Sequence, residues 1–277
     1  MATYLAIVTG GAQGIGHAIT SAILQSGGKV HFLDIEEELG IKAQAEFDEK
    51  YGVGKSKFVM CDVSNREELK EVFIAAKREM GGLNVVCNNA GIHAPVFDRS
   101  HWPKVVDVNL TAVIQGTLLG LDLMAVSKGG QGGVVINTSA MAGLRPVPLA
   151  PVYSATKHGI IGLSRSLAPM SIADKVRINC VCPDGTNTTL VANSMAELLP
   201  VFSVEEIQKI LVKHIYQLDL NEETMQAGPD LKGDPADALL RPSEVGEEVF
   251  KLIQDDSKNG EALVVSKQLG TYYWQFN

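Results

Sequence analysis

The sequence predicts an α/β fold built on one doubly wound, parallel sheet of about seven strands with helices on both faces. Short runs of β-branched and other apolar residues recur along the chain, and stretches with the helical spacing of apolar residues separate most of them. The strand runs are apolar at consecutive positions, so both of their faces must be covered, which is typical of parallel sheets. Ligands bind such a sheet at the carboxyl ends of its strands.

The order of the elements follows from these runs. The expected strands are residues 4–8, 29–33, 57–61, 84–87, 134–137, 176–182 and 261–265. The expected helices are residues 15–26, 36–50, 65–80, 101–127 and 152–168. Ser64 and Glu67 have the spacing of a capping box, which predicts that the third helix begins with Ser64 as its cap.

Residues 187–242 interrupt the alternation of strands and helices. They contain polar turns, an amphipathic helix expected near residues 204–218, and a stretch rich in Gly, Pro and Asp over residues 228–242. The segment is too long for an ordinary loop, and we expect it to be a lid over the substrate. No internal repeat or interdomain linker is visible, so residues 1–277 are expected to form one domain that contains this insertion.

The composition indicates a globular protein that binds small molecules. Of the 277 residues, 45% are hydrophobic and 20% are charged, and the formal net charge is -8. The charges form no long runs of one sign, whereas binding to a phosphate backbone rests on clustered Lys and Arg, so no nucleic acid partner is expected. The four cysteines form no CxxC pair and lie in or beside apolar runs, so neither a disulfide framework nor a metal site is expected.

The N-terminus and the apolar runs give no sign of a membrane. No basic stretch followed by an apolar core opens the chain, and no apolar run approaches the roughly 20 residues of a membrane span. We therefore expect a cytoplasmic protein without a membrane span.

A glycine-rich turn follows the first expected strand, in the stretch LAIVTGGAQGIGHAI. Gly10, Gly14 and Gly16 let the backbone turn tightly and let a pyrophosphate approach the helix N-terminus, where free N–H groups and the helix dipole favour negative charge. The spacing differs from the commoner GxGxxG pattern, and a plain turn between a strand and a helix explains the glycines alone equally well.

An aspartate at the end of the second expected strand favours a dinucleotide site. Asp34 stands about 20 residues after the glycines, where a carboxylate accepts hydrogen bonds from the ribose hydroxyls and would repel a 2′-phosphate. The sequence therefore predicts NAD rather than NADP as the cofactor. The alternative is an aspartate that caps the following helix.

Two further strands end in residues suited to the adenosine half of the cofactor. Asp62 could accept a hydrogen bond from the adenine amino group, with Val63 packed on the ring. The fourth strand leads into the sequence NNAG at residues 88–91, where Ala90 and Gly91 leave room for the ribose. Each feature alone is more typical of a turn, and their shared place at strand ends is what favours a binding site.

Tyr153 and Lys157 stand at positions i and i+4 of an expected helix and therefore lie on the same face. A nearby ammonium stabilises a phenolate, so we expect Lys157 to lower the pKa of Tyr153 toward neutrality. Tyr153 would then take a proton from an alcohol and return it in the reverse reaction. A YxxxK pattern is common by chance, and the alternative is a tyrosine of the core.

The motifs occur in an order that resembles the short-chain dehydrogenase/reductase family over nearly the whole chain. The set comprises TGGAQGIG, Asp34, Asp62-Val63, NNAG, Asn109 in VNL, and Tyr153 with Lys157. The resemblance implies an NAD-dependent oxidoreductase with a Rossmann-type fold and a homodimer through residues 101–127 and 152–168. It implies that the backbone carbonyl of Asn109 holds a water beside Lys157, which also holds the nicotinamide ribose. The alternative for Asn109 is a kink or cap in a long helix.

The resemblance also implies which residues bind the cofactor and which are catalytic. The expected cofactor contacts are Gly10, Gln13, Gly14, Ile15, Gly16, Asp34, Ile35, Asp62, Val63, Asn89, Ala90, Gly91, Tyr153, Lys157, Pro183, Thr186 and Thr188. The expected catalytic residues are Asn109, Tyr153 and Lys157, and the family adds a serine.

The family serine does not stand at its usual place in this chain. The family pattern is N-x-S-S-x-A-G, in which the second serine orients the substrate oxygen. Aligning Asn137 without a gap puts Ser139 on the first serine and Ala140 on the second. Adjacent side chains of a strand point to opposite faces, so Ser139 is a candidate substitute only if the loop after the strand rearranges. Losing one such donor costs on the order of 10² to 10³ in rate.

A second departure follows the sixth expected strand. Pro183 is followed by Asp184, where the family has glycine. A carboxylate here is expected near the nicotinamide, where it would favour the positively charged, oxidised ring. Thr186 and Thr188 still match the positions that hold the carboxamide in the family.

The predicted function is the interconversion of a secondary alcohol and a ketone on a mostly apolar small molecule, such as a hydroxy fatty acid derivative, oxylipin, lactone or terpenoid. The alternative is a catalytically impaired scaffold or small-ligand carrier that binds NAD and lacks the family serine. A reductase that uses NADP is a weaker alternative, which Asp34 opposes.

Overall fold

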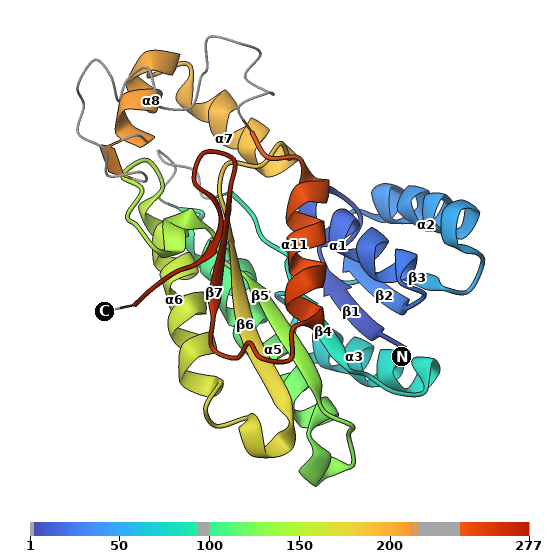
Figure 1. Ribbon diagram of the computed structural model, residues 1–277. Helices are drawn as coiled ribbons and strands as arrows, with labels where there is room; N and C mark the ends of the chain where they lie inside the picture. Colours follow the sequence, from blue (N-terminus) through green and yellow to red (C-terminus); the bar gives the residue numbers. More distant parts are fainter. Residues whose placement is uncertain (1–2, 94–99, 212, 215–238, 277) are drawn as a thin grey trace.

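The structure, a computed structural model, describes residues 3–93, 100–211, 213–214 and 239–276. One twisted sheet forms the middle layer, and helices cover both of its faces (Figure 1). This arrangement confirms the expected fold class.

The sheet has eight strands in the order β3-β2-β1-β4-β5-β6-β7-β8. Their bounds are β1 Leu5–Thr9, β2 Lys29–Asp34, β3 Ser56–Met60, β4 Val85–Asn88, β5 Gly133–Thr138, β6 Val176–Pro183, β7 Ala262–Ser266 and β8 Gly270–Tyr273. The strands β1 to β7 pair in parallel and begin within one residue of their expected starts. β8 was not expected and runs antiparallel to β7.

The helices form two layers. One face of the sheet carries α1 Gly14–Gln25, α2 Glu37–Tyr51 and α11 Pro242–Gln254, and the other carries α3 Arg66–Met80, α5 Ala112–Met124 and α6 Pro151–Leu167. The side chains of β1 alternate between the layers, because Ala6 and Val8 pack with α1 and α11 while Ile7 packs with α3. Burial on both faces explains why the strands are apolar at consecutive positions.

The cap of α3 differs from the expected capping box. Asn65 is the N-cap residue, and its side chain accepts a hydrogen bond from Glu68 N–H at 3.4 Å. The Ser64 hydroxyl instead donates to Asp62 Oδ1 at 2.7 Å. The prediction is wrong because the turn after β3 offers Ser64 a closer acceptor than the helix does.

The helix expected at residues 101–127 is divided into three parts. α4 Trp102–Val106 and α5 are separated by a π-helical turn, Asp107–Thr111, in which Ala112 N–H donates to Asp107 O. By length and composition alone, Trp102–Met124 is apolar enough to cross a membrane, a test that the core helices of soluble proteins also pass. This segment packs on β4 and β5 and lies beside α6, so it is a scaffold for the site described below.

The insertion expected at residues 187–242 is described only in part. It contains α7 Thr189–Leu198, which was not expected, and α8 Val204–Leu211, which agrees with the first half of the helix expected near residues 204–218. Residues 215–238, with most of the Gly/Pro/Asp-rich stretch, lie outside the described residues. α7 and α8 stand beyond the carboxyl ends of the strands (Figure 1).

The aromatic tail forms part of the sheet and its covering layers. Tyr272, Trp274 and Phe276 pack with the cluster between the sheet and α6, whereas Tyr273 packs on the opposite face. The guanidinium of Arg145 lies 4.9 Å from the centroid of the Trp274 ring. The tail therefore braces the loop that precedes α6.

Candidate active site

The sequence motifs gather at the carboxyl edge of the sheet, next to the point where the strand order reverses. β2 lies on one side of β1, and β4 lies on the other. The glycine-rich turn follows β1, and the NNAG sequence at residues 88–91 begins at the end of β4. Because ligands of doubly wound sheets bind at such a reversal, this geometry favours a site between the two segments.

Close packing requires glycine in the turn after β1. A Cβ atom on Gly16 would overlap the carbonyl oxygen of Gly10, and a Cβ atom on Gly10 would lie 2.9 Å from Ala90 Cα. Gly10 and Gly14 have φ angles of +64° and +56°, which favour glycine. The turn is therefore held tightly against the end of β4.

The first turn of α1 offers backbone N–H groups to an anion. Gln13 is the N-cap residue, but it makes no capping hydrogen bond with its side chain, and no acidic residue lies in the first turn. Ile15 packs against the core beside this turn. An uncapped helix N-terminus behind a glycine cradle fits a pyrophosphate, so these residues suit a dinucleotide cofactor.

Asp34 is buried at the end of β2 and is bound by the backbone. Its Oδ2 accepts a hydrogen bond from Ala12 N–H at 3.0 Å, and its Oδ1 accepts one from Glu36 N–H at 3.2 Å. The N-cap residue of α2 is Glu36, so the alternative of a helix-capping Asp34 is wrong. A carboxylate has about four acceptor positions, so capacity remains for ribose hydroxyls. Ile35 beside it is exposed.

Asp62 forms a turn at the end of β3. Desolvation would raise its pKa, but hydrogen bonds from Ser64 and Lys104 outweigh this effect and hold the pKa below its ordinary value. The Lys104 ammonium lies 2.9 Å from Asp62 Oδ2. An adenine amino group would have to share these oxygens with Ser64 and Lys104. Val63 is buried beside this turn.

The end of β4 is fixed by hydrogen bonds to β1. Thr9 Oγ1 accepts from the N–H groups of Asn89 and Ala90, each at 3.0 Å. The amide of Asn89 donates to the carbonyl oxygens of Thr9 and Gly10 at 3.2 Å. Thus the side chain of Asn89 shapes the cofactor turn, and the backbone of Ala90 and Gly91 remains as the surface toward a ligand.

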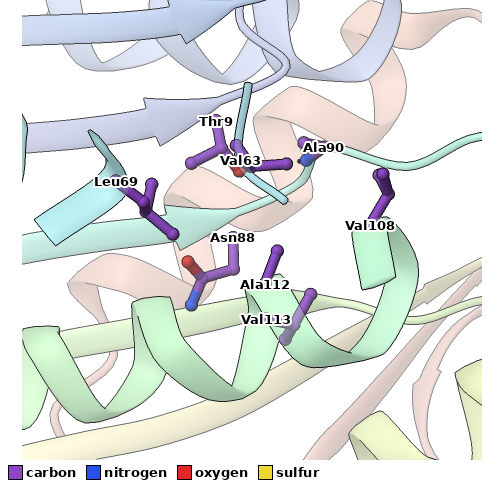
Figure 2. A pocket seen from close by; sticks show the side chains of 8 residues that line it. All are labelled: Thr9, Val63, Leu69, Asn88, Ala90, Val108, Ala112 and Val113. Carbon is purple, nitrogen blue, oxygen red and sulfur yellow. Dashed lines mark hydrogen bonds between the residues drawn. The ribbon is translucent and has the colours of Figure 1, made fainter. Parts of the chain in front are cut away.

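Below this contact lies a cavity of about 10 Å³, large enough for about one water (Figure 2). Figure 2 shows Thr9, Asn88 and Ala90 on one side of it and Val108 and Val113 from the long helical segment on the other. The cavity is too small for any part of a cofactor. It indicates that the NNAG segment packs on the π turn with little free space.

Helix α6 presents Tyr153 and Lys157 beside the ends of β4 and β5. Lys157 Nζ donates to Thr138 O at 2.9 Å and lies 5.4 Å from the centroid of the Tyr153 ring. A Cβ atom on Gly91 would lie 3.7 Å from Lys157 Nζ and 3.4 Å from Asn109 Oδ1. The structure therefore brings the helix pair, the NNAG glycine and Asn109 together.

Burial sets the proton affinities of this pair. It raises the pKa of Tyr153 to about 12 and lowers the pKa of Lys157 to about 8. The expectation that Lys157 lowers the pKa of Tyr153 toward neutrality is wrong for this structure, because desolvation penalises the phenolate and is the dominant cause. Both side chains are therefore shifted toward their uncharged forms.

Asn109 is fully buried in the middle of the π turn. Its Oδ1 accepts from Ile92 N–H at 2.8 Å, and its Nδ2 donates to Ile92 O at 2.9 Å. Asn109 therefore lies at an irregular turn of a long helix, and its side chain also fixes the segment that follows NNAG. A π turn widens the helix and disturbs its carbonyl pairing, and such turns are frequent at functional sites.

Ser139 and Ala140 follow β5. The Ser139 hydroxyl donates to the backbone oxygen of Lys157 at 2.8 Å, and the residue is buried. Its single proton is thus used against α6, and Ser139 would have to break this bond in order to orient a substrate oxygen. Ala140 is extended and partly exposed, with no side-chain donor.

The segment after β6 lies over the glycine-rich turn. Pro183 ends the strand, and Thr186 is buried beside it. A Cβ atom on Gly14 would lie 3.2 Å from the methyl carbon of Thr188, so Thr188 borders the cofactor turn. Asp184 accepts hydrogen bonds from Ser266 Oγ and Gly185 N–H, each at 2.8 Å. The expected approach of this side chain to the nicotinamide must therefore compete with its contact to Ser266 at the end of β7.

A buried polar network anchors the catalytic helix, and sequence reasoning missed it. Asn137 Oδ1 accepts from Asn88 Nδ2 at 2.8 Å and from Thr117 Oγ1 at 3.1 Å, while Asn137 Nδ2 donates to Ser164 Oγ at 2.8 Å. These bonds join β4, α5, β5 and α6 and fix the relative positions of their functional residues. The signal in the sequence was polar residues within apolar runs. Across the described parts of the chain, no three His, Cys, Asp or Glu side chains gather as a metal site.

Three comparisons place the chain among known proteins. A model of the short chain dehydrogenase family matches residues 4–198. A 15-hydroxyprostaglandin dehydrogenase from Macaca fascicularis, whose name specifies NAD(+), is 35% identical over 280 residues, covering 99% of this chain and 94% of the relative. A 3beta-hydroxysteroid dehydrogenase from Mediterraneibacter gnavus is 33% identical over 197 residues, covering 69% of each chain. A crystal structure of an actinorhodin polyketide ketoreductase variant with NADPH has a TM-score of 0.80 and 26% identity, covering 98% of both chains.

Proposed function

The chain belongs to the short-chain dehydrogenase/reductase family and is an oxidoreductase of alcohols and ketones, and on that premise we propose that it uses NAD, with Tyr153 as acid and base. The observation that carries this proposal is the placement of Tyr153, Lys157, Asn109 and Gly91 around one point at the carboxyl edge of the sheet. A binding module has no need of a Tyr-Lys pair at that point.

The choice of NAD rests on Asp34. Its buried carboxylate next to the glycine-rich turn would accept hydrogen bonds from ribose hydroxyls and would repel a 2′-phosphate. The relative whose name specifies NAD(+) supports this choice, whereas the ketoreductase structure contains NADPH. The proposed contacts are the glycine-rich turn with Gln13 and Ile15, Asp34 and Ile35, Asp62 and Val63, residues 89–91, Tyr153 and Lys157, and Pro183 with Thr186 and Thr188.

The proposed chemistry needs little from the protein besides proton transfer and positioning. NAD, when bound, accepts or supplies the hydride. In ketone reduction Tyr153, whose proton burial retains, protonates the ketone oxygen. In alcohol oxidation the phenolate form of Tyr153, which the Lys157 ammonium stabilises, takes the hydroxyl proton. The Lys157 ammonium stabilises the phenolate that ketone reduction leaves behind. The backbone carbonyl of Asn109 holds a water that carries the proton onward to solvent.

The donor that usually orients the substrate oxygen is the weak point of the site. Ala140 has no hydroxyl, and Ser139 has used its proton toward Lys157 O. We propose that Tyr153 acts as the main hydrogen-bond donor to the oxygen, with Ser139 as a substitute after a change in its hydrogen bonding. The absence of one donor would lower the rate by about 10² to 10³ relative to a complete site.

The proposed substrate is a mostly apolar secondary alcohol or ketone, such as a hydroxy fatty acid derivative, oxylipin, lactone or terpenoid. Leu149, from the loop that leads into α6, packs with Leu198 and Ile207 of α7 and α8, which supports an apolar wall on this side of the site. The two curated relatives are named for a hydroxyprostaglandin and a hydroxysteroid, which are molecules of similar character. We propose that residues 187–242 act as a lid over this wall.

We also propose a cytoplasmic homodimer with no nucleic acid partner and no membrane span. Leu118 is an exposed apolar side chain on α5. An exposed apolar side chain supports a partner surface along α5 and α6. The exposed apolar side chain would be covered by the second copy.

A second candidate is a protein that binds NAD without efficient turnover. The alanine at position 140 favours it, because the retained cofactor turn would then serve a scaffold or a ligand carrier.

The proposed function is tested by following NADH and NADPH in a panel of apolar secondary alcohols and ketones. We expect turnover of at least one panel member with NAD and at least about tenfold lower kcat/KM with NADP, because Asp34 opposes the 2′-phosphate. Equal use of both nucleotides would refute the role of Asp34. NAD binding without turnover of any member would favour the second candidate.

A further inference from the structure

His93 connects helix α7 to the segment that Asn109 holds. The residue before it, Ile92, is bound through both its N–H and its carbonyl oxygen by the Asn109 side chain, at 2.8 Å and 2.9 Å. These are contacts to the backbone, so the side chain of Ile92 does not affect them. Asn109, a residue of the proposed proton path, therefore fixes the backbone immediately before His93.

The imidazole of His93 contacts two side chains on one face of α7. Its Nδ1 lies 2.7 Å from Ser194 Oγ, and its Nε2 lies 3.1 Å from Glu197 Oε2. Ser194 and Glu197 are three residues apart and so share a helix face. The His93 side chain is 12% exposed and that of Glu197 39%, so water competes only weakly at the imidazole end of the pair.

Counting protons decides the form of His93 that completes this arrangement. The Ser194 hydroxyl has one proton, and its oxygen lies 2.9 Å from the carbonyl oxygen of Leu190, to which it donates. Ser194 Oγ must then accept from His93 Nδ1, while the Glu197 carboxylate accepts from Nε2. All three hydrogen bonds form together only when both imidazole nitrogens carry a proton. The contact is then a charge-assisted hydrogen bond.

The other end of α7 is attached to the cofactor turn. Thr189 Oγ1 lies 2.8 Å from Gln13 Oε1, and Thr188 borders Gly14. α7 therefore spans from the turn after β1 to the segment after β4. The contact with Thr189 is exposed, whereas His93 supplies the more buried of the two attachments.

α7 packs on the loop that leads into α6. Leu198 and Met195 of α7 pack with Leu149 and Val147 of this loop. The loop ends where α6 begins, two residues before Tyr153. The position of α7 therefore shapes the apolar wall next to the proposed acid and base.

Resting on the proposed function, we infer that His93 is a positioning residue that latches α7 to the Asn109 segment and thereby sets the affinity for the alcohol or ketone. The latch joins three parts of the site: the proton path at Asn109, the apolar wall on α7 and the cofactor turn at Gln13. Among the described residues, Glu197 is the charged group that contacts His93.

A double-mutant cycle with His93→Gln and Glu197→Gln tests the latch. Each single change should raise KM for the alcohol by about tenfold, because one charge-assisted bond is lost, and should leave KM for NAD within about twofold. The double variant should resemble each single variant, because both changes remove the same contact. Losses that add in the double variant would overturn the proposal, because they would show two independent effects. Equal changes in KM for the alcohol and KM for NAD would also overturn it, because they would show a general structural effect.

Hydrogen exchange of the α7 amides tests the same latch without any substrate. Both single variants should exchange faster across residues 189–198, and the core strand β5 should keep its wild-type exchange. The matched control is Glu248→Gln, which breaks the ion pair with Lys251 on the distant α11 and should change neither α7 exchange nor KM.

The exchange result stands apart from the fate of the proposed function. Unchanged α7 exchange in His93→Gln would overturn the latch even if the wild type turns over a substrate. Faster α7 exchange with an unchanged KM would overturn the link to substrate affinity. A wild type without any turnover would refute the proposed function, and the exchange arm would still decide whether His93 holds α7.

Discussion

At the scale of single residues, Tyr153 and Lys157 show how burial outweighs proximity. They share a helix face, as expected from their spacing, but the pKa of Tyr153 rises to about 12 because its phenolate would be desolvated. Lys157 shifts the opposite way, to about 8, because its ammonium form is the one that burial penalises. The sequence predicted the pair correctly, whereas the sign of the tyrosine shift depended on a burial that no local pattern encodes.

The shifts predict that ketone reduction slows as the pH rises above about 8. Tyr153 keeps its proton up to about pH 12, so the acid remains available over the whole useful range. Lys157 loses its proton near pH 8, and with it goes the charge that stabilises the phenolate left after proton transfer. The kcat of NADH-dependent ketone reduction, measured from about pH 6 to 10, should fall on the alkaline side. A kcat that is constant across this range would contradict the role of Lys157.

Ala140 allows a test by adding the missing group. Ala140 has an extended backbone at the end of β5, which any residue adopts, so Ala140→Ser should fold normally. If the site merely lacks a donor to the substrate oxygen, kcat should rise by up to about 10²-fold. The neighbouring Ser139→Ala serves as the comparison and should lower the free energy of unfolding by about 1 kcal/mol through loss of its bond to Lys157 O. An unchanged kcat in Ala140→Ser would mean that another group already orients the oxygen.

Asp184 has a hydrogen-bond partner that is distant in sequence. Its side chain accepts from Ser266, the last residue of β7. Asn137 is similar, because its three bonds reach residues on three other elements. Such partners are distant in sequence, so they emerge only from the fold.

At the scale of elements, the predictability of each segment followed its apolar pattern. Strands β1 to β7 are compact apolar runs, and each was predicted to within one residue at its start. The π turn at Asp107–Thr111 has no separate pattern, since a helix with one extra residue in a turn keeps nearly the same apolar spacing. α7 was missed because its sequence, TLVANSMAEL, mixes apolar and polar positions without a clear apolar stripe, and only Leu198 is buried.

The glycine-rich turn can be tested by adding a methyl group to one of its glycines. Gly16→Ala places a methyl group on the carbonyl oxygen of Gly10, so the turn must open and NAD affinity should fall by at least about 100-fold. The control is Gly162→Ala, which adds the same methyl group to an exposed position of α6 and meets nothing within 4 Å.

Both variants are compared by calorimetric titration with NAD and by circular dichroism. Gly162→Ala should bind NAD like the wild type. A folded Gly16→Ala with wild-type NAD affinity would contradict the role assigned to this turn.

At the scale of the whole molecule, the sheet order explains why distant motifs meet. β2 and β3 are added on one side of β1, and the strands from β4 onward are added on the other side. This reversal of strand order places the turn with Gly16 beside the NNAG segment. α6 packs on β5 and β6, and the buried network around Asn137 holds it there. The fold class and the gathering of the motifs at one edge could be predicted from the sequence, because the strand ends of a doubly wound sheet share one edge. The side-chain hydrogen bonds across that edge could not be predicted, because their partners are distant in sequence.

The central claim is that the chain turns over an alcohol or ketone through Tyr153. Its most direct test is the rate of NADH formation from the best secondary alcohol of the panel, measured for the wild type and for Tyr153→Phe, together with their affinities for NAD. The account predicts turnover by the wild type, a loss of at least about 10²-fold in Tyr153→Phe, and a fall in NAD affinity of at most about tenfold, because the change removes the proton-transferring hydroxyl and at most one contact to the cofactor. Equal turnover by the two proteins, or NAD binding by the wild type with no turnover, would contradict it.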